Sequence, residues 1–286
     1  MPVLSYFPVK VKRKPIPFRY PGGKFYALNL LAPFWLNKEY DEYREPFVGG
    51  GSVFFSKPKS EFNILNDIDS ELITTYRVMQ NPELRERLIE RVKDETASPE
   101  RWKEVLELVP QSDLDIAFKY YYLNRTSFSG KLSSPAWGYR DKRSLPPHRW
   151  EERIRPCGRF LEGAELLNTD FEDVIRQAPR GNNVLIFVDP PYYRPTKKKH
   201  YRYGFNEEDH LRLAECLRRT PHDFFLTYED APEIRELYAW ANLYKMQFTY
   251  RVDNSAVQNG ERKNGDELII ANFRINTIGD QAMFEN

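Results

Sequence analysis

The chain has 286 residues, of which 41% are hydrophobic and 15% aromatic, and this suits one large domain or one domain that carries an insertion. The formal net charge is only +1, so global charge does not indicate a nucleic-acid partner, and any electropositive face must be local. No apolar run approaches the roughly 18 residues of a membrane helix, no signal-peptide core is apparent, and the two cysteines and four histidines lack metal-ligand spacing. We therefore expect a reduced, cytoplasmic protein with no bound metal.

A glycine cluster follows the first predicted helix. Residues 1–24 are rich in proline and basic residues and lead through a turn into a helix from about Phe25 to Leu36. Beyond it, Gly49-Gly50-Gly51 lets the backbone approach a ligand closely and is predicted to open a short helix with free N–H groups. Because the cluster lacks the spacing of a dinucleotide or phosphate-loop motif, Gly49 and Gly51 are ligand-binding candidates of low specificity.

An acidic strand end comes next. Residues 62–69 are typical of a strand that ends in acidic residues, with Ser70 as a candidate cap for a helix from about Glu71. A carboxylate in the position of Asp67, at the carboxyl end of a strand, commonly accepts the two ribose hydroxyls of a nucleoside cofactor. Helix capping is the alternative role, and this residue alone does not decide between the two.

Charged helices and an irregular segment follow. From Asn81 to about Leu123 apolar residues recur at helical spacing, which predicts a small helical bundle with solvated outer faces. Residues 124–150 mix small, aromatic and basic residues without a helical period, so we expect an irregular loop or hairpin. The mixture suits contacts with nucleic-acid phosphates and base edges, although an ordinary surface loop can have the same composition. The candidate contact residues in it are Arg125, Ser127, Lys131, Arg140, Lys142 and Arg143.

Another acidic strand end lies near Asp170. A short strand at residues 165–168 precedes it, and its carboxylate is predicted to accept from the exocyclic amine of a cofactor adenine, with Phe171 stacking on the ring. Helix capping is again the alternative. Several acidic strand ends beside a glycine turn are harder to explain by capping than any one of them.

The most informative motif is Asp189-Pro190-Pro191-Tyr192, which follows the apolar run at residues 184–188. That run has the length and composition of a buried parallel strand. The two prolines force a turn at its carboxyl end, where open α/β sheets bind their ligands. The turn brings a carboxylate, rigid carbonyls and an aromatic ring together, a set that suits a planar base with an exocyclic amine. A proline-rich strand exit with a solvated aspartate is the alternative.

The C-terminal part alternates helices and strands. We expect helices at residues 207–219 and 232–240, and strands at residues 223–228, 245–252 and 267–273. A basic, aromatic segment (residues 195–203) and a polar segment (residues 254–266) interrupt this pattern. The alternation predicts an α/β fold with a mostly parallel sheet, in which the helical region is an insertion.

The order of these motifs resembles that of the Dam-type DNA adenine-N6 methyltransferases, which are alpha-group amino-methyltransferases that use S-adenosyl-L-methionine (AdoMet). The resemblance covers about residues 16–275. Its motifs, in family order, are Arg19 to Lys24, Glu45 to Phe55, Asn66 to Ile73, Tyr122 to Arg125, Asp189 to Tyr192, and the segment Asn254 to Asp266.

The resemblance implies a doubly wound, Rossmann-like methyltransferase sheet. It places the catalytic domain in residues 1–75 and 159–286, and an inserted helical and hairpin target-recognition domain in residues 76–158. It also implies AdoMet as the cofactor. The implied cofactor-binding residues are Tyr20, Gly22, Gly23, Lys24, Glu45, Pro46, Phe47, Gly49, Gly51, Asp67, Asp170 and Phe171.

The resemblance further implies the reaction and the partners. A target adenine is flipped out of double-stranded DNA, Tyr192 stacks on it, and Asp189 and the Pro190 carbonyl accept from its N6 amine, with Pro191 completing the catalytic motif. No covalent enzyme intermediate is needed, so positioning supplies much of the rate. A cognate restriction endonuclease would act on the same site, and the enzyme would lie with the nucleoid. Side chains of the two C-terminal segments are implied to contact DNA, namely Lys197, Lys198, Lys199, Asn259, Arg262 and Lys263.

The recognition sequence and some competing functions stay open. Relatives that read GATC carry Asn-Gly followed soon by Leu and a guanine-reading Arg, whereas this chain has Ser129-Gly130-Lys131-Leu132-Ser133, so the resemblance does not extend to GATC. Related glutamine and cytosine enzymes usually carry Asn or Ser in place of Asp189, which favours adenine. The alternatives are an RNA adenine methyltransferase and a non-catalytic DNA-binding module with this fold.

Overall fold

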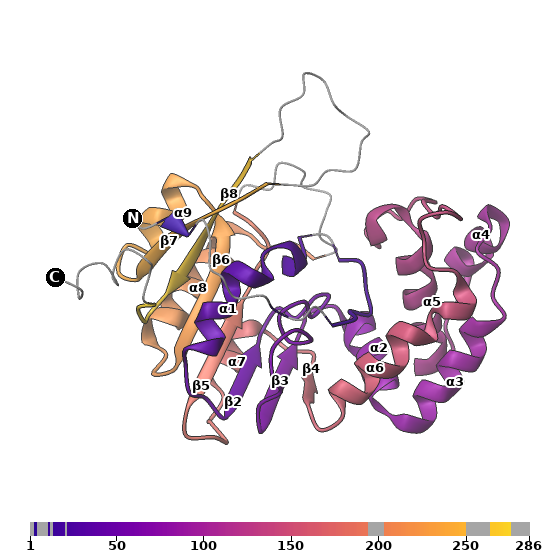
Figure 1. Cartoon of the computed structure of the whole chain (residues 1–286), viewed down its shortest axis with the longest axis horizontal. Coiled ribbons are helices and arrows are strands. Elements are labelled where there is room, and N and C mark those ends of the chain that lie inside the picture. The colour runs from indigo at the N-terminus through magenta and orange to yellow at the C-terminus, as the bar shows by residue number, and fades with distance from the viewer. Residues whose placement is uncertain are drawn as a thin grey trace.

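The computed structural model of the chain describes residues 3–4, 11, 14–20, 22–193, 203–249 and 264–275. Its strands are β1 (Val3–Leu4), β2 (Glu42–Glu45), β3 (Phe62–Asn66), β4 (Glu165–Leu167), β5 (Val184–Val188), β6 (Asp223–Glu229), β7 (Asn242–Thr249) and β8 (Asn264–Ala271). They form one sheet in the order β1-β7-β8-β6-β5-β2-β3-β4 (Figure 1). Strand β8 is antiparallel to β6 and β7, and the other neighbouring pairs are parallel. The predicted mostly parallel sheet is confirmed.

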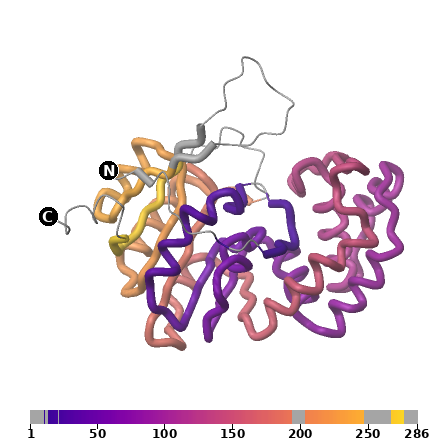
Figure 2. The backbone as a smooth tube through the Cα atoms, viewed as in Figure 1, coloured from indigo at the N-terminus to yellow at the C-terminus, as the bar shows by residue number. Residues whose placement is uncertain are grey.

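The helices fall into two groups along the chain. Their bounds are α1 (Leu28–Leu36), α2 (Ser70–Gln80), α3 (Pro82–Lys93), α4 (Pro99–Glu107), α5 (Asp113–Thr126), α6 (Glu151–Leu161), α7 (Phe171–Arg176), α8 (Glu207–Arg219) and α9 (Pro232–Leu237). After β3 the chain leaves the sheet, forms α2 to α6 as a separate helical group, and returns to the sheet at β4 (Figure 2). We refer to α2–α6 and their connections as the helical half.

Both faces of the sheet are buried, because alternate side chains of its central strand enter different cores. In β5, Leu185 and Phe187 pack in a core with α1 and the helical half. The alternate residues Val184, Ile186 and Val188 pack in a second core with α7, α8 and α9. A side-chain period of two thus turns one continuous apolar run into two interfaces. Helices on both faces confirm the doubly wound α/β architecture.

The helical half is continuous with the first core. Helix α2 packs against α5 and α6, and α4 packs against α5. Asn81 and Ser98 cap α3 and α4 with their side chains, and each is followed by a proline at the first helical position. The expected domain boundaries, at residues 75/76 and 158/159, fall inside α2 and α6. The inserted target-recognition domain therefore stays a prediction.

Strand β2 is absent from the sequence-based prediction, because three of its four residues are charged. All four residues are buried in the structure. Arg44 pairs with Glu42 at 2.7 Å and donates to the carbonyls of Val174 and Gln177, each at 2.8 Å. These charges are buried only because distant parts of the chain supply their partners.

Other local expectations were wrong in detail. The glycine cluster forms hydrogen-bonded turns and not a short helix. Helix α2 is capped by Asp69, and not by Ser70, since the Asp69 side chain accepts from the N–H groups of Glu71 and Leu72. Helix α5 continues through Thr126, so the predicted irregular segment begins later than expected.

None of the described helices is both long and apolar enough to cross a membrane.

His210 in α8 is a buried histidine among aromatic side chains. Its Nδ1 lies within hydrogen-bond distance of the Tyr228 hydroxyl. The rings of Tyr193 and Phe205 pack edge-on against the imidazole, with 5.0 and 4.6 Å between ring centroids. Burial lowers the pKa of His210 to about 4. An unfolded histidine titrates near a pKa of about 6.5. Between these values His210 binds fewer protons in the folded protein than in the unfolded chain, so its contribution to stability is lost in acid.

We therefore expect the free energy of unfolding of His210→Gln, relative to that of the wild type, to rise as the pH falls from about 6.5 to about 4, because the variant lacks this contribution. Urea titrations at several pH values within this window measure the slope. The exposed His148 supplies the matched variant, His148→Gln, which should retain the wild-type slope. A wild-type slope in His210→Gln would contradict the prediction.

Candidate functional site

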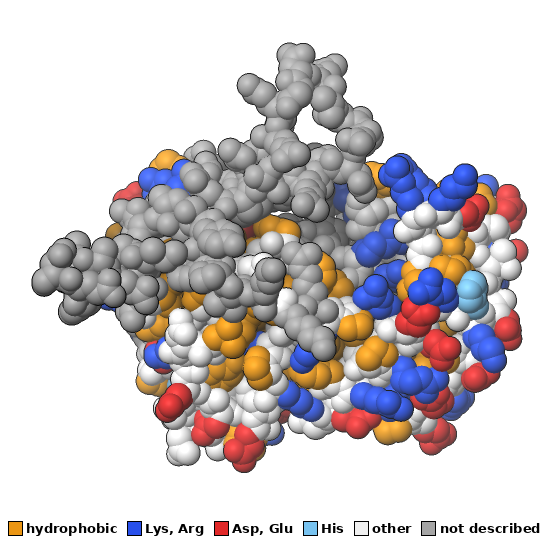
Figure 3. Space-filling view, in the orientation of Figure 1, with side chains coloured by type: hydrophobic (Ala, Val, Ile, Leu, Met, Phe, Trp, Pro, Cys, Tyr) orange, Lys and Arg blue, Asp and Glu red, His pale blue; other side chains and the backbone are white. Residues whose placement is uncertain are grey.

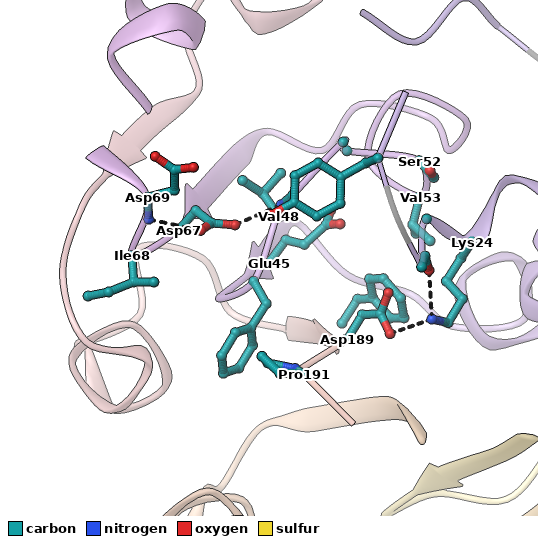
Figure 4. A pocket seen from close by; sticks show the side chains of 18 of the residues that line it. Lys24, Glu45, Val48, Ser52, Val53, Asp67, Ile68, Asp69, Asp189 and Pro191 are labelled. Atoms are coloured by element: carbon teal, nitrogen blue, oxygen red, sulfur yellow. Dashed lines mark hydrogen bonds and ion pairs between the residues drawn. The ribbon is translucent and has the colours of Figure 1, made fainter. Parts of the chain in front are cut away.

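The candidate site lies at the point where the strand order of the sheet reverses. Strands β2, β3 and β4 extend to one side of this point, and β5 and β6 extend to the other. The carboxyl ends of β2 and β5 therefore border a crevice, which is where open α/β sheets bind ligands. A cavity of about 810 Å³, part of it open to solvent, lies here. Its wall includes Glu45 at the end of β2 and Asp189 just after β5 (Figure 4).

A glycine turn after β2 forms one wall of the cavity. Gly49 and Gly51 have φ values of +46° and +66°, a backbone region that favours glycine. A Cβ at Gly49 would lie 2.8 Å from the ring of Tyr20. The turn thus packs closely on Tyr20 while its backbone lines the cavity.

Asp67 holds this turn from the end of β3. Its Oδ2 accepts from the N–H of Gly49 at 2.9 Å, and its Oδ1 accepts from the N–H of Asp69 at 3.0 Å (Figure 4). Burial raises the pKa of Asp67 to about 6. Because Asp69 caps α2, the capping role considered for Asp67 belongs to its neighbour. Asp67 itself lines the cavity.

Apolar side chains line another part of the wall. Phe47 stacks on Phe171, with 5.5 Å between the ring centroids and 27° between the planes, and contacts Phe205 edge-on at 5.7 Å. Ile68 lines the cavity and is 52% exposed, which is high for a large aliphatic residue. A planar heteroaromatic ring would bury this apolar surface.

Asp189 is held through a single carboxylate oxygen. The Nζ of Lys24 lies 2.6 Å from Oδ1 (Figure 4), and the hydroxyl of Thr227 donates to Oδ1 at 2.7 Å. Lys24 is buried and also donates to the Gly22 carbonyl at 3.0 Å. Among the described residues no donor reaches Oδ2, so this oxygen is available to accept from a ligand amine.

Glu45 is a second carboxyl group in the cavity wall. Its Oε2 accepts from the hydroxyl of Tyr43 at 2.8 Å. Burial raises the pKa of Glu45 to about 8, with the charge of Asp189 acting in the same direction and the Tyr43 hydrogen bond opposing both. Glu45 is therefore largely protonated near pH 7, which reduces charge repulsion between the two carboxyl groups.

Tyr192 lies beside the cavity and not in its wall. The Nζ of Lys24 is 4.9 Å from the centroid of the Tyr192 ring, and the ring of Tyr228 is 6.2 Å away. Burial, reinforced by the charge of Glu267, holds the pKa of Tyr192 well above its usual value. Pro191 lines the cavity, whereas Pro190 is buried outside its wall.

Most of the predicted cofactor-binding residues meet at this cavity. Those in its wall are Tyr20, Gly22, Gly23, Lys24, Glu45, Phe47, Gly49, Gly51 and Asp67. Pro46, Asp170 and Phe171 are outside it. Asp170 accepts from the Glu172 N–H at 2.9 Å as the cap of α7, and its other oxygen pairs with Arg212 at 3.0 Å. Asp170 thus caps α7 and pairs with Arg212, and its contact with a cofactor amine stays a prediction. Phe171 contacts two residues of the wall, Phe47 and Phe205, at 5.5 and 5.7 Å between ring centroids.

The predicted DNA-contact residues differ in how exposed they are. Arg140, Lys142 and Arg143 are exposed, and Lys131 and Arg125 are half-buried. Ser127 is fully buried, and its hydroxyl accepts from the indole N–H of Trp102 at 3.1 Å, so it offers no surface to DNA and this expectation is corrected. The remaining candidates lie outside the described residues, namely Lys197, Lys198, Lys199, Asn259, Arg262 and Lys263.

Several residues of the site were missed from the sequence. Thr227 reaches Asp189 because β6 pairs with β5 in a register that aligns Leu226 with Val188. Only the strand pairing reveals this contact. Ile68 carried a readable signal, since it is an aliphatic residue between two acidic ones at a strand end. The others in the cavity wall are Val48, Gly50, Ser52, Val53, Asp69, Phe187, Tyr203, Gly204 and Phe205.

Comparison with known proteins shows similarity over most of the chain. The family model of the D12 class N6 adenine-specific DNA methyltransferases matches residues 20–252. The Type II methyltransferase M1.LlaDCHI of Lactococcus lactis subsp. cremoris is 24% identical over 279 residues, covering 89% of this chain and 94% of that protein. The DNA N-6-adenine-methyltransferase of Escherichia phage P1 is 30% identical over 243 residues, covering 77% of this chain and 30% of that protein. The DNA adenine methylase of Escherichia coli strain K12 is 26% identical over 240 residues, covering 79% of this chain and 84% of that protein. The strand ends that border the cavity all lie within the span that the family matches.

Proposed function

The chain belongs to the D12 class of N6 adenine-specific DNA methyltransferases, and we propose that its cavity binds AdoMet beside a flipped-out adenine of double-stranded DNA. The observation that carries this proposal is the state of Asp189. Lys24 and Thr227 hold its Oδ1, and Oδ2 is engaged by no described donor. A fixed carboxylate with one available oxygen suits the capture of an exocyclic amine.

The cavity fits AdoMet, a cofactor that the family implies. When bound, AdoMet supplies a methyl group on a positively charged sulfur. The glycine turn would bring bare backbone against the cofactor, and Asp67 would accept its ribose hydroxyls. Phe47, Ile68 and Phe205 would pack on its adenine ring.

Asp67→Ala should weaken AdoMet binding by about 1.5–3 kcal/mol, since it removes a carboxylate acceptor and releases the Gly49 turn. Isothermal titration calorimetry measures the dissociation constant. Asp41→Ala is a matched control, because Asp41 also accepts from two backbone N–H groups, those of Asn182 and Asn183, but at the amino end of β2. An unchanged dissociation constant for Asp67→Ala, or an equal loss in both variants, would remove Asp67 from the binding set.

The target adenine would lie against the turn that follows β5. Asp189 Oδ2 and the carbonyl of Pro190 would accept the two N6 hydrogens, while Tyr192 stacks on the base after a local rearrangement that brings its ring to the cavity. Acceptance of both hydrogens draws the amine toward a pyramidal geometry and exposes its lone pair. Lys24, which stays on Oδ1, would keep the carboxylate charged and oriented.

The helical half is proposed to hold the DNA. Figure 3 shows Lys and Arg side chains along its side that faces the hollow between the two halves. Arg140, Lys142 and Arg143 are exposed in the connection from α5 to α6, where they suit phosphate or base contacts. The DNA contacts predicted near residues 197–199 and 259–263 remain predictions.

The partner and the compartment follow from this reaction and stay proposals. Three relatives bear names of Type II methyltransferases. We accordingly propose a cognate restriction endonuclease that acts on the same DNA site. We also propose that the enzyme acts in the cytoplasm, at the nucleoid, where its DNA substrate would lie.

The test is transfer of a labelled methyl group from AdoMet to unmethylated genomic DNA, with RNA as the competing acceptor. N6-methyladenine at one short sequence motif supports the proposal and supplies the recognition sequence. Transfer to RNA alone, or no transfer by a protein that binds AdoMet, contradicts it.

A further inference from the structure

A second pocket, lined by three arginines, adjoins the cavity. It encloses about 610 Å³ of space that opens to solvent. Its wall includes Arg19, which precedes the Tyr20 turn, Arg125 from the last turn of α5, and Arg153 from α6. All three are half-buried, so the pocket concentrates positive charge where water screens it less than at an open surface. We call this pocket the arginine pocket.

No carboxylate in the described part of the chain forms an ion pair with the arginines of the pocket, although the charge of Arg153 acts on Glu152. The ionisable groups that act on Arg19 and Arg125 are other arginines and two tyrosines, and no carboxylate within the described ranges pairs with either. Glu152, which precedes Arg153 in the sequence, is bound by Arg149 at 2.6 Å. The buried Nε atoms of Arg19 and Arg125 have no hydrogen-bond partner in the described part of the chain. Unpartnered buried donors with a net charge are costly unless a ligand accepts from them.

The arrangement of the arginines is fixed by their backbones. Arg19 donates its N–H to the side chain of Asn124 at 3.0 Å, and the Asn124 amide donates back to the Arg19 carbonyl at 2.8 Å. The guanidinium of Arg19 donates to the carbonyl of Arg125. A Cβ at Gly130 would lie 2.2 Å from the Arg19 carbonyl oxygen, so this contact requires glycine. The pocket is therefore built into the joint between the N-terminal segment and the helical half.

The burial and crowding of these groups also change their proton affinity. Burial, reinforced by the neighbouring charge of Arg125, lowers the pKa of Arg19 to about 10. Burial likewise lowers the pKa of Arg125. Both groups stay charged at neutral pH, and an anion between them would relieve the repulsion.

We infer that the arginine pocket binds a backbone phosphate of the DNA substrate. The planar forks of arginine match phosphate oxygens, and a phosphate offers acceptors to several guanidinium N–H groups at once. The inference rests on the proposed DNA substrate and deepens it, because it places a DNA strand at the pocket formed by Arg19 and Arg153 together with Arg125.

Two observations favour a DNA phosphate over a free anion or a cofactor carboxylate. Arg125 begins the segment that leads to the exposed cations Arg140, Lys142 and Arg143, so the pocket and these cations share one connection of the helical half. Tyr20, Gly23 and Ser52 line both the arginine pocket and the cavity. A strand anchored by its phosphate at the pocket would therefore lie close to the position proposed for its flipped adenine.

Arg153→Gln tests the inference, since Arg153 makes no described ion pair and its loss should not disturb the fold. Affinity for duplex DNA is measured by fluorescence anisotropy at several salt concentrations, without AdoMet. One phosphate contact contributes about 0.9 to the slope of log K against log salt. We expect the slope of Arg153→Gln to be shallower than that of the wild type by about this amount. When the salt concentration rises from about 50 to about 200 mM, the variant should then lose about threefold to fourfold less DNA affinity than the wild type loses. Arg87→Gln, which removes an exposed charge from α3, should change the slope much less.

Neutral methylphosphonate linkages, introduced one at a time, locate the contact. A methylphosphonate at one position should weaken DNA binding by the wild type. The same linkage should have little effect on binding by Arg153→Gln, because that variant has already lost the contact. The calorimetric affinity for AdoMet should be unchanged in the variant. These results support the inference, and they do not depend on methyl transfer, so a protein that fails the activity test can still pass this one.

An unchanged salt slope in Arg153→Gln overturns the inference. So does a loss of AdoMet affinity with normal DNA binding, which would assign the pocket to the cofactor carboxylate. A third contrary result combines two measurements. Inorganic phosphate would stabilise the wild type against heat but not Arg153→Gln, while the salt dependence of DNA binding would be the same in both proteins. That outcome would assign the pocket to a free anion.

Discussion

Asp189→Ala is expected to lower the rate of methyl transfer by about 10²–10³-fold or more, while duplex DNA binding stays close to that of the wild type. The structure gives the reason. Asp189 is the carboxylate whose Oδ1 is held by Lys24 and Thr227, and its Oδ2 is engaged by no described donor. Removing it takes away the acceptor proposed for N6 and leaves the buried Lys24 without its ion pair. Single-turnover transfer of a labelled methyl group measures the rate without product release.

Asp189→Asn separates catalysis from packing. The asparagine carbonyl can still accept from Lys24 and Thr227, but its amide group is a donor and would oppose the donor hydrogens of N6. We therefore expect Asp189→Asn to be nearly as slow as Asp189→Ala and to unfold at a temperature closer to that of the wild type. A turnover rate within a few-fold of wild type in both variants would refute the catalytic assignment.

Arg44→Met is expected to destabilise the protein by about 3–5 kcal/mol, which is the usual cost of removing one partner of a buried ion pair. Arg44 and Glu42 are both fully buried in β2. Without the guanidinium, Glu42 loses its counter-charge, and the carbonyls of Val174 and Gln177 lose a donor. A loss of this size is a large fraction of the total stability of a domain, about 5–15 kcal/mol.

Urea unfolding measures the free energies, with Arg176→Met as the matched control. Arg176 pairs with Glu172 at 2.8 Å but is 62% exposed, so its loss should cost about 1 kcal/mol or less. The double variant Glu42→Gln with Arg44→Met should recover part of the loss, because no charge is then left unpaired. A cost for Arg44→Met no larger than that for Arg176→Met would contradict a structural role for the buried pair.

The sequence by itself determined the elements whose signals are local. The apolar run of β5 and the two prolines after it predicted both the strand and the turn at Asp189, because a continuous apolar run of that length suits a strand buried on both faces. The bounds of α8 were predicted in full, since its start is marked by a capping box at Asn206 and Asp209 and its stripe of apolar residues is regular. The alternation of such elements was enough to predict the α/β class.

Tertiary structure alone decided the positions of the charged groups. The sequence gives no local sign that Glu42 and Arg44 are buried, because their partners come from α7 and from the turn before β5. The ion pair between Lys24 and Asp189 joins residues from distant parts of the chain. The pairing of Asp170 with Arg212 likewise joins the start of α7 to α8.

The arginine pocket shows the same limit most clearly, since Arg19, Arg125 and Arg153 stand in three unrelated stretches of the chain. Hydrophobic period, capping residues and prolines act over a few neighbouring residues, so they can be read in order along a sequence. The energy of a charge depends on which distant groups and how much water surround it, and only the folded chain fixes that environment.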